Sequence, residues 1–566
     1  MILHYLGGSI HMSGSLTIRR ILGDRPFAEI GTPSAVAVDE ERGLVAVGGN
    51  LGYLQWSGCG TAKDRWRPYR VGIYDTGDLR CRWVLESRWP VHSFAFHPTL
   101  PVVAVGTGAY DGGYFFEGEL LILDLESERS TSVIHGAREV LHVGWESKRT
   151  LRVVVAPPDD CDYDEAHTHG FAAVVERSDW SDVAPGSVRQ EELSGQWVEC
   201  ERPRMEAAAD RGTESLAGLA GNPWWEPRRQ VWDVQGLRDG RVLACSDGVL
   251  AEAWLPDGRL EWRVPDEEGG RQFAIRAGQR DAWVNVERRR VRWVGRERVT
   301  EPPLVARVSL EDGKVLDSLR VDTSVALTSR DDGWLALRST AWDRHPEPTA
   351  LISPAGEGPE VRVPLGGFDL FNHAFPIRHS RQLLFLQGKE REPWRDKWVV
   401  AVDPACPDGE PSVRQLFPLD WDAKRARHLF GGPGIEIGHA ENRDLVHAGA
   451  VHDGAGLLPG NAFVVRRSLG DGAARWTFTA DFPATALDGD DDTVYVAFNS
   501  GELVALRTSD GAVRWRQQLV VGGQPVVPLS LTRTEAGRLL IGTVDGRILD
   551  CSVADSAGHQ PSPMVR

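Results

Sequence analysis

The sequence lacks the features that identify several common classes of protein. Its seven cysteines are odd in number, far apart and without a Cys-x-x-Cys pair, so we expect neither a disulfide scaffold nor a zinc ribbon. No segment approaches the ~20 consecutive apolar residues of a membrane helix, and residues 1–20 lack the basic and apolar regions of a signal peptide. These absences predict a cytoplasmic protein with reduced thiols and no membrane partner.

Recognisable catalytic motifs are also missing. The chain has no Gly-x-Ser-x-Gly elbow, no P-loop, no His-Glu-x-x-His and no dinucleotide fingerprint. We therefore assign no catalytic residues and no cofactor, and expect a protein that is not an enzyme. The 64 Lys and Arg against 81 Asp and Glu give a net charge of -17, which makes nucleic acid an unlikely partner.

What the chain does have is repetition. Residues 493–506 (TVYVAFNSGELVAL) and 538–551 (RLLIGTVDGRILDC) share one pattern, in which two apolar strands flank a turn that contains glycine. This pattern predicts a β-hairpin. An Asp-Gly-x-x-x-Trp phrase occurs three times, at Asp257–Trp262, Asp471–Trp476 and Asp510–Trp515. Its three tryptophans and three aspartates are expected to pack neighbouring repeats together.

Similar units can be traced along the whole chain. Ten are counted, beginning near Ser34, and a helix is expected near 204–221 within a polar interruption at 183–229. The last unit offers only about three strands, and Leu16–Ile21 is an isolated strand that would complete it. The predicted fold is all-β: a single closed β-propeller of about seven to ten blades over residues 1–566, closed by its N-terminal strand, with a partly helical insertion at 183–229 and a polar tail at 554–566.

Two stretches resemble known propeller repeats. Residues 34–135 resemble WD40 repeats, most clearly where Ser-x-Ala-Phe-His-Pro is followed by Val-Ala-Val-Gly and Leu-Ile-Leu-Asp-Leu. The terminal Trp-Asp of a WD40 repeat is absent, and Leu123-Asp124-Leu125 stands in its place. Residues 472–551, and in part 236–264, resemble the PQQ-like repeat that also occurs in non-enzymatic scaffold propellers. Both resemblances imply a propeller fold, and neither implies a particular function.

One segment could bind a metal ion. Residues 159–169 (DDCDYDEAHTH) combine acidic oxygens with a His-x-His pair, a donor set that suits zinc or a related ion. The candidate ligands are His167, His169, Asp162 and Asp164. No spacing dictates a third fixed ligand, so a solvated turn between two strands remains the favoured interpretation.

Aromatic and arginine side chains are candidates for contacts with other proteins. Trp224 and Trp225 follow the expected helix, and Arg289, Arg290 and Arg292 lie in an arginine-rich segment that is framed as a hairpin. Exposed Trp and Arg side chains on a rigid support are typical of protein-binding hot spots.

Three functions are compatible with these observations. The favoured one is a non-catalytic scaffold that presents loops to one or more protein partners in a bacterial cytosolic complex. Mixed WD40-like and PQQ-like units also resemble the propeller members of multi-gene systems with MoxR-type ATPases and von Willebrand A proteins. The alternatives are a metal-dependent hydrolase or lyase that uses the propeller channel, and a propeller that binds carbohydrate or another small ligand.

Overall fold

The structure, a computed structural model, describes most of the 566 residues. The described ranges are 15–52, 67–276, 278–286, 291–294, 297–330, 332–340, 348–354, 361–365, 377–388, 397–404, 410–419, 428–439, 442–452 and 459–553. Within them the chain is mostly β-strand, and its one α-helix is α1 (Met205–Leu219). The all-β prediction and the predicted helix are therefore confirmed. The predicted tail at 554–566 lies outside the described residues.

The repeated phrases form hairpins, as predicted. β37 (Thr493–Phe498) pairs with β38 (Glu502–Arg507), and β43 (Leu539–Thr543) pairs with β44 (Ile548–Val553), in both cases antiparallel. The turns between them carry Gly501 and Gly546 at positive φ, which glycine adopts without the steric cost that a Cβ would add. These hairpins are the central strands of two of the ten sheets of three to five strands that the described chain forms.

Three of these sheets follow one another near the N-terminus and form a group that we call the stack. Its first sheet is β2 (Thr32–Asp39), β3 (Leu44–Asn50), β4 (Tyr69–Asp75) and β5 (Cys81–Ser87). Its second sheet is β6 (Val91–Phe96), β7 (Val102–Tyr110), β8 (Phe116–Asp124) and β9 (Arg129–Ser132). Its third sheet is β10 (Val140–Trp145), β11 (Thr150–Val155), β12 (His169–Glu176) and β13 (Gln196–Glu199).

The stack has two different ends. The first sheet is covered by α1 and the short helix η1 (Ala28–Ile30), which share a buried cluster with it through Phe27, Leu216 and Trp225. The third sheet buries one face against the second sheet, but its other face carries exposed charged side chains, among them Arg152 and Glu176. Charged side chains on that face suit contact with water, so the stack ends at the third sheet.

The other seven sheets form a second group. Six of them are consecutive along the chain. The first three are the sheet of β14 (Val231–Gly236), β15 (Val242–Ser246), β16 (Val249–Trp254) and β17 (Leu260–Pro265), the sheet of β18 (Gly270–Ile275), β19 (Asp281–Val286), β22 (Leu304–Ser309) and β23 (Val315–Arg320), and the sheet of β24 (Val325–Ser329), β25 (Leu335–Ser339), β26 (Thr349–Ile352) and β27 (Val361–Val363). The next three are the sheet of β29 (Leu383–Gln387), β30 (Trp398–Asp403) and β31 (Ser412–Pro418), the sheet of β28 (Ile377–Arg378), β32 (His428–Ile437), β33 (Asp444–His452), β34 (Ala462–Ser468) and β35 (Ala474–Ala480), and the sheet of β36 (Ala484–Gly489), β37, β38 and β39 (Val513–Gln518). The seventh joins β42 (Pro528–Arg533), β43 and β44 to β1 (Leu16–Leu22). Two short hairpins, β20 (Val291–Val294) with β21 (Glu297–Thr300) and β40 (Val520–Val521) with β41 (Gln524–Pro525), stand outside these sheets.

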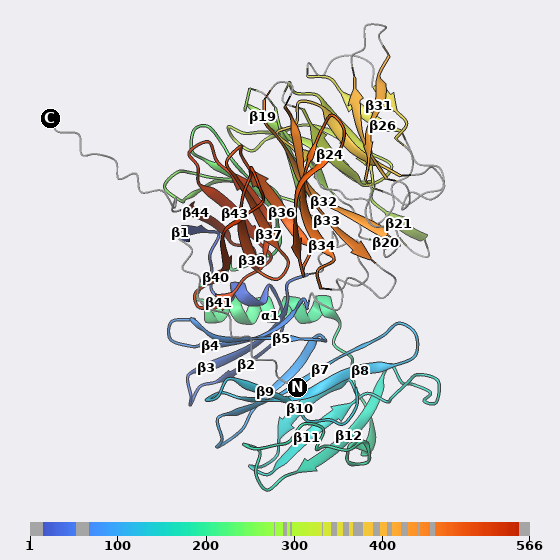
Figure 1. The fold of residues 1–566 in the computed structure, drawn as a ribbon. Helices are drawn as coiled ribbons and strands as arrows, with labels where there is room; N and C mark the ends of the chain where they lie inside the picture. The colour runs from blue at the N-terminus through green and yellow to red at the C-terminus, as the bar shows by residue number, and fades with distance from the viewer. Residues whose placement is uncertain are drawn as a thin grey trace, which may run out of the picture.

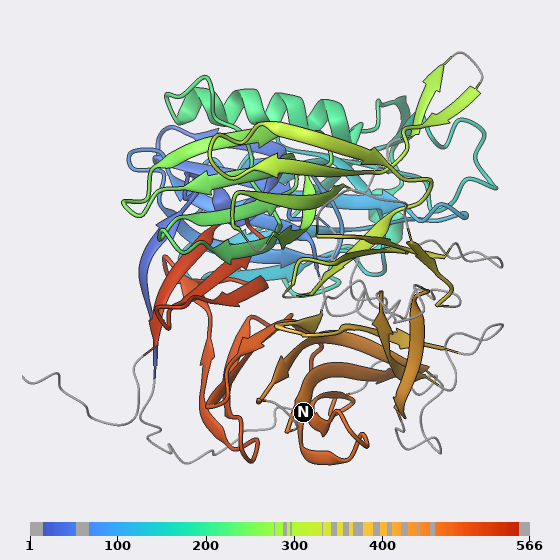
Figure 2. The same cartoon turned by 90° about the horizontal axis from the view of Figure 1, so that it is seen from above.

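Buried contacts connect these seven sheets in a cycle. Each sheet shares a hydrophobic cluster with the next, and the seventh shares one with the first. Representative pairs, in order from the β42 sheet, are Leu540 with Val234, Leu243 with Val284, Trp283 with Leu327, Leu351 with Phe385, Phe417 with Leu445, Trp476 with Leu487, and Trp515 with Leu531. We call this group the ring, and Figure 2 shows its sheets, coloured from green to red, arranged about a common centre.

The N-terminal strand completes the seventh sheet, as predicted. β1 pairs antiparallel with β44, from Leu16 opposite Val553 to Leu22 opposite Ile548. The side chain of Arg20 reinforces this pairing, because its Nε donates to the carboxylate of Asp550 at 2.7 Å. The edge of β44 is thereby covered by a strand of the same chain, which removes a site for pairing with other molecules.

The stack and the ring are joined by polar contacts beside α1, which lies between them in Figure 1. Arg547 of the ring contacts Asp545 and donates to Glu29 of the η1 segment at 3.1 Å. Arg229 donates to the hydroxyl of Thr32 on β2 at 3.0 Å. The stack is thus held against the β42 and β14 sheets of the ring.

The arrangement differs from the predicted one in which all units follow one another around one ring. Three of the ten sheets lie in the stack, between β1 and β14 in the chain, and the buried contacts of the cycle pass through the other seven. The predicted insertion at 183–229 is not a single unit. It contains β13, which is the fourth strand of the third stack sheet, and only α1 and the residues that flank it are additional to the sheet. Each sheet has the same local pattern in either group, so spacing alone did not separate them.

Candidate functional site

The segment with the predicted metal ligands lies in the stack and not at the centre of the ring. Residues 156–168 connect β11 to β12 in the third stack sheet, which Figure 1 places farthest from the ring. His167 Nε2 is 3.5 Å from Asp160 Oδ2, and His169 Nδ1 is 3.6 Å from Glu165 Oε2. The two histidines therefore face different carboxylates.

Neighbouring aromatic rings position both histidines. The ring of His167 makes edge contacts with Tyr110 and Phe116, and the ring of His169 stacks on Trp197 with centroids 5.6 Å apart. Asp162 and Asp164 are exposed. Across the described ranges, no three His, Cys, Asp or Glu side chains gather closely enough to hold a metal ion.

The same segment builds a projecting tip together with the β7–β8 hairpin. We define the aromatic tip as residues 110–117 with residues 158–167. Phe115 forms an isolated β-bridge with Asp159, and the amide of Asp160 donates to the carbonyl of Tyr114 at 3.0 Å. At its end the side chains of Tyr114 and Phe115 are 60% and 53% exposed. Sequence analysis missed this pair, although three consecutive aromatic residues directly after Asp-Gly-Gly, Tyr114 to Phe116, were a signal for it.

Several hydrogen bonds hold the backbone of the aromatic tip. Oδ1 of Asp111 accepts from the amides of Gly113, Tyr114 and Phe115 at 2.7, 2.8 and 3.0 Å. These backbone donors lower the pKa of Asp111. Tyr110 donates its hydroxyl proton to Asp160 at 2.6 Å; this hydrogen bond raises the pKa of Tyr110 to about 12 and lowers that of Asp160.

Inside the ring, a set of polar side chains contact one another across several sheets. Arg378 on β28 donates to Asp233 on β14 at 2.7 Å and to the carbonyl of Leu531 on β42 at 3.0 Å. It therefore connects three sheets of the ring. The other oxygen of Asp233 accepts from the amide of Phe273 at 2.9 Å. Burial raises the pKa of Asp233, against the lowering effect of Arg378.

A second carboxylate in the ring is also fully buried. Asp488 accepts from the amide of Arg533 at 2.7 Å and lies 2.8 Å from Nε2 of His379. Burial alone would raise the pKa of Asp488, but His379 and the other donors more than offset it, so the pKa lies below its usual value. These contacts stabilise the ring as a structure, because each carboxylate is matched by donors from other strands.

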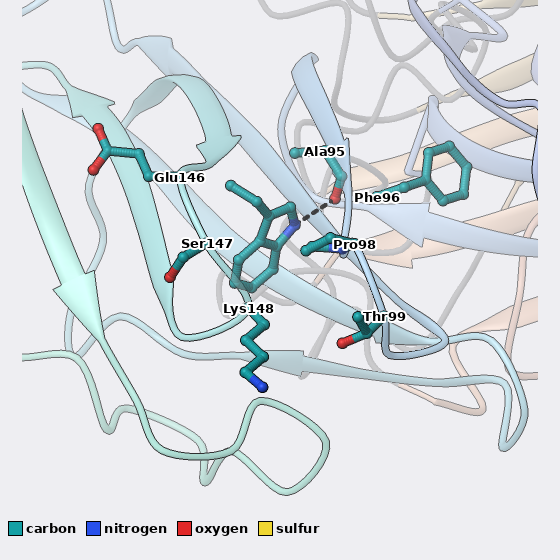
Figure 3. A pocket seen from close by; sticks show the side chains of 8 residues that line it. Ala95, Phe96, Pro98, Thr99, Glu146, Ser147 and Lys148 are labelled. Atoms are coloured by element: carbon teal, nitrogen blue, oxygen red, sulfur yellow. Dashed lines mark hydrogen bonds between the residues drawn. The ribbon is translucent and has the colours of Figure 1, made fainter.

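A hollow of about 480 Å³ opens between two loops of the stack. Figure 3 shows the side chains that line it, from the last residues of β6 and β10 and from the loops that follow these strands. One wall is the indole of Trp145, whose Nε1 donates to the carbonyl of Ala95 at 3.0 Å. His97 stands behind it: its Nδ1 accepts from the amides of Thr99 and Leu100, so Nε2 carries the proton toward the carbonyl of Lys148.

The residues of the repeated Asp-Gly-x-x-x-Trp phrase have separate tasks. Trp476 and Trp515 are buried in clusters between ring sheets, and Trp262 packs at the edge of another. The aspartates cap their own turns: Asp257, Asp471 and Asp510 accept from the amides of Arg259, Ala473 and Ala512. The glycine of the phrase also approaches the neighbouring sheet closely, since a Cβ on Gly511 would lie 2.7 Å from the ring of Trp476.

The predicted interaction residues are distributed over different environments. Trp224 is 87% exposed beyond the end of α1, but Trp225 is buried and donates to the carbonyl of Pro26 at 3.1 Å. Trp225 is therefore a core residue. Arg289 and Arg290 lie outside the described residues, and of Arg292 the structure describes the β20 backbone alone.

Comparisons with known proteins found likenesses among solved structures alone. No protein-family model matches the chain, and no curated protein matches it. The WD40 domain of Neurospora crassa Pan2 is 11% identical with a TM-score of 0.38, over 57% of this chain and 89% of that one. A streptogramin B lyase structure is 10% identical with a TM-score of 0.40, over 58% and 95%, and the WD40 β-propeller domain of Doa1 is 10% identical with a TM-score of 0.38, over 58% and 94%.

Across the described ranges, no helix combines the length and the apolar character needed to cross a membrane.

Proposed function

We propose that this protein is a non-catalytic scaffold for protein interactions, in which a closed seven-bladed propeller carries a three-sheet stack that presents a binding tip. The observation that carries the proposal is the aromatic tip. Two adjacent aromatic side chains, Tyr114 and Phe115, are more than half exposed on a backbone that is already fixed by Asp111 and by the bridge to Asp159.

Rigidity matters because binding has an entropic cost. When a loop must be ordered on association, the binding free energy becomes less favourable by about 0.5–1.5 kcal/mol for each immobilised flexible side chain. At the aromatic tip the backbone is ordered before any partner arrives, and aromatic side chains have few rotatable bonds. Exposed aromatics in such a setting are the residues that dominate interface energies.

The two alternative functions would use different parts of the molecule. A metal-dependent hydrolase or lyase would need ligands that converge at the centre of the ring, and the described carboxylates there are engaged by Arg378, His379 and backbone amides. A carbohydrate-binding propeller would need aromatic side chains gathered on one face. Among the described residues, the large exposed aromatics are Tyr114 and Phe115 at the tip and Trp224 beyond α1.

The proposal extends to a bacterial cytosolic complex, with partners of the MoxR ATPase and von Willebrand A classes as its most specific form. The support for this form is the resemblance of the repeats to propeller members of such systems. Free thiols at the described cysteines, including the exposed Cys161, are compatible with a reducing compartment.

The test compares partner capture by matched variants. The tagged protein is purified from its host as the wild type, as Tyr114→Ser/Phe115→Ser, and as Val315→Ser/Leu316→Ser. The control replaces two adjacent apolar residues that are each 50% exposed on β23 of the ring. Loss of two hot-spot aromatics at roughly 1–2 kcal/mol each predicts at least a tenfold fall in captured partner, with no change in the control.

Two results would contradict the proposal. One is a wild-type protein that co-purifies with no stoichiometric partner in a native mass spectrum. The other is equal capture by the tip variant and the wild type, when circular dichroism shows both to be folded. Metal analysis of the same samples tests the hydrolase or lyase alternative, which expects a bound divalent ion at the stoichiometry of the protein.

A further inference from the structure

We infer that the aromatic tip binds a cationic protein segment, rich in Arg or Lys, through its aromatic faces and a surrounding group of carboxylates. This inference rests on the proposed function, because it names the chemistry of the partner that the tip would take. It starts from the exposed pair Tyr114 and Phe115, and the charges around this pair determine which partner fits.

The charges of the aromatic tip have one sign. Its two segments, residues 110–117 and 158–167, contain seven acidic residues and no Lys or Arg. The acidic residues are Asp111, Glu117, Asp159, Asp160, Asp162, Asp164 and Glu165. His167 is the one histidine in these segments, and it lies against Asp160. An approaching partner therefore meets a local negative field.

Two arginines lie in the interior behind the tip. Arg202 lies over the ring of Phe116, at 3.9 Å from its centroid, and contacts Glu139. Arg138 is 6% exposed and donates to Gln190 at 2.8 Å. Glu139 balances the charge of Arg202. Arg138 is a single buried cation behind the tip that also interacts with Asp159, so the seven carboxylates still leave the tip with a net negative charge.

Aromatic rings beside carboxylates favour one class of ligand. The face of an aromatic ring attracts an ammonium or a guanidinium group, and nearby carboxylates add Coulomb attraction and accelerate association. The same carboxylates repel nucleic acid, phosphorylated peptides and anionic membranes. Asp162 and Asp164 are exposed, and an exposed carboxylate can accept two parallel hydrogen bonds from a guanidinium group.

The structure also shows why the tip is suited to an extended segment. Its two loops are joined side by side through the bridge of Phe115 with Asp159 and the hydrogen bond from Asp160 to Tyr114. The aromatic pair therefore stands next to the acidic 159–165 turn at a fixed separation. A basic side chain can contact a ring while a neighbouring one reaches the carboxylates.

The test uses short fluorescent peptides as probes and the full-length protein. The probes are a peptide of alternating Arg and Gly and a peptide of alternating Glu and Gly of the same length, with binding measured by fluorescence anisotropy. We expect the Arg peptide to bind the wild type at least tenfold more tightly than the Glu peptide, and to weaken about threefold to tenfold in Tyr114→Ser/Phe115→Ser. We expect Asp162→Asn/Asp164→Asn to weaken it about threefold and to reduce its dependence on salt.

A matched control separates the tip from the general charge of the protein. Glu206→Gln/Asp210→Asn removes two exposed carboxylates from α1 and changes the net charge by the same amount. Equal weakening in this control and in Asp162→Asn/Asp164→Asn would overturn the inference, because binding would then follow net charge alone. Equal binding of the Arg and Glu peptides would also overturn it.

The two proposals fail in different ways. If Tyr114→Ser/Phe115→Ser abolishes capture of the cellular partner while Asp162→Asn/Asp164→Asn captures it fully, the scaffold function stands and the cationic partner is wrong. If neither variant changes capture although a partner is present, the tip is not the binding site and both proposals are wrong at this position.

Discussion

Replacing Arg378 with methionine is expected to destabilise the ring, because it removes a side chain that connects β28, β14 and β42. In the wild type its guanidinium donates to Asp233, to Thr532 and to the carbonyl of Leu531. Asp233 is 3% exposed. Without Arg378, a buried carboxylate loses its cationic partner, while methionine preserves much of the volume of the side chain.

The expected loss of stability follows from the burial of this pair. Breaking a buried ion pair by removing one partner costs about 3–5 kcal/mol. Because the Arg378 side chain is itself 18% exposed, solvent screens part of the interaction, and we expect about 2–4 kcal/mol. Removing both charges in Arg378→Met/Asp233→Asn should cost only about 1 kcal/mol, since asparagine still accepts from the amide of Phe273.

The pH dependence provides an independent check. Burial raises the pKa of Asp233 above its unfolded value, and loss of Arg378 raises it further. A carboxyl whose pKa is raised by folding favours the native state at low pH, and that contribution disappears as the pH rises through the folded pKa. The Arg378→Met variant should therefore be least stable, relative to the wild type, at neutral pH, and the difference should shrink as the pH falls toward the folded pKa of Asp233.

Urea unfolding, followed by tryptophan fluorescence, measures the loss of stability and its pH dependence. It is carried out on the wild type, Arg378→Met, Asp233→Asn and the double variant, which together form a double-mutant cycle. A coupling free energy of about 1–3 kcal/mol between the two positions is expected. The reasoning is refuted if Arg378→Met loses less than about 1 kcal/mol, or if the double variant is as unstable as Arg378→Met alone. It is also refuted if the difference between Arg378→Met and the wild type does not change with pH.

Two further changes test the packing between sheets and the closure of the ring. Trp476→Ala should lower the free energy of unfolding in urea by about 3–5 kcal/mol, because the side chain is 8% exposed and its Nε1 donates to the carbonyl of Thr508. The control is Trp224→Ala, at a site 87% exposed, which should lower the free energy of unfolding by less than about 0.5 kcal/mol. Deletion of residues 1–22 should expose the edge of β44 and produce concentration-dependent oligomers in light scattering, whereas a monomeric truncated protein would contradict the role assigned to β1.

Much of the fold could be predicted because local pattern determines it. Alternating apolar residues with glycine turns specified the hairpins at 493–506 and 538–551, and an incomplete last unit predicted the pairing of residues 16–21. The separation into stack and ring could not be predicted from spacing, since a sheet in either group has the same strands and turns. The relevant signal was the composition of one face, where Arg152 and Glu176 occupy positions that ring sheets fill with apolar side chains.

The candidate site was harder to predict than the fold. The segment at 159–169 was singled out for its metal-ligand chemistry, but its hydrogen bonds and ring contacts show that it supports the neighbouring hairpin. That role depends on a contact between Phe115 and Asp159, and no periodicity within either segment reveals such a contact. The ion pair of Arg378 with Asp233 joins residues 145 positions apart, so it too required the three-dimensional structure.

The pairing of β1 with β44 has a consequence for how the protein is made. The hydrogen-bonded partners Arg20 and Asp550 are 530 residues apart in the chain, and ribosomes add about 5–20 residues per second. For roughly half a minute to two minutes, the N-terminal strand is outside the ribosome before its partner has been synthesised. During that time the stack can already fold, since its three sheets are contiguous in the sequence. The order of synthesis therefore makes the ring the last part to form and its closing strand the part that must be protected longest from pairing elsewhere.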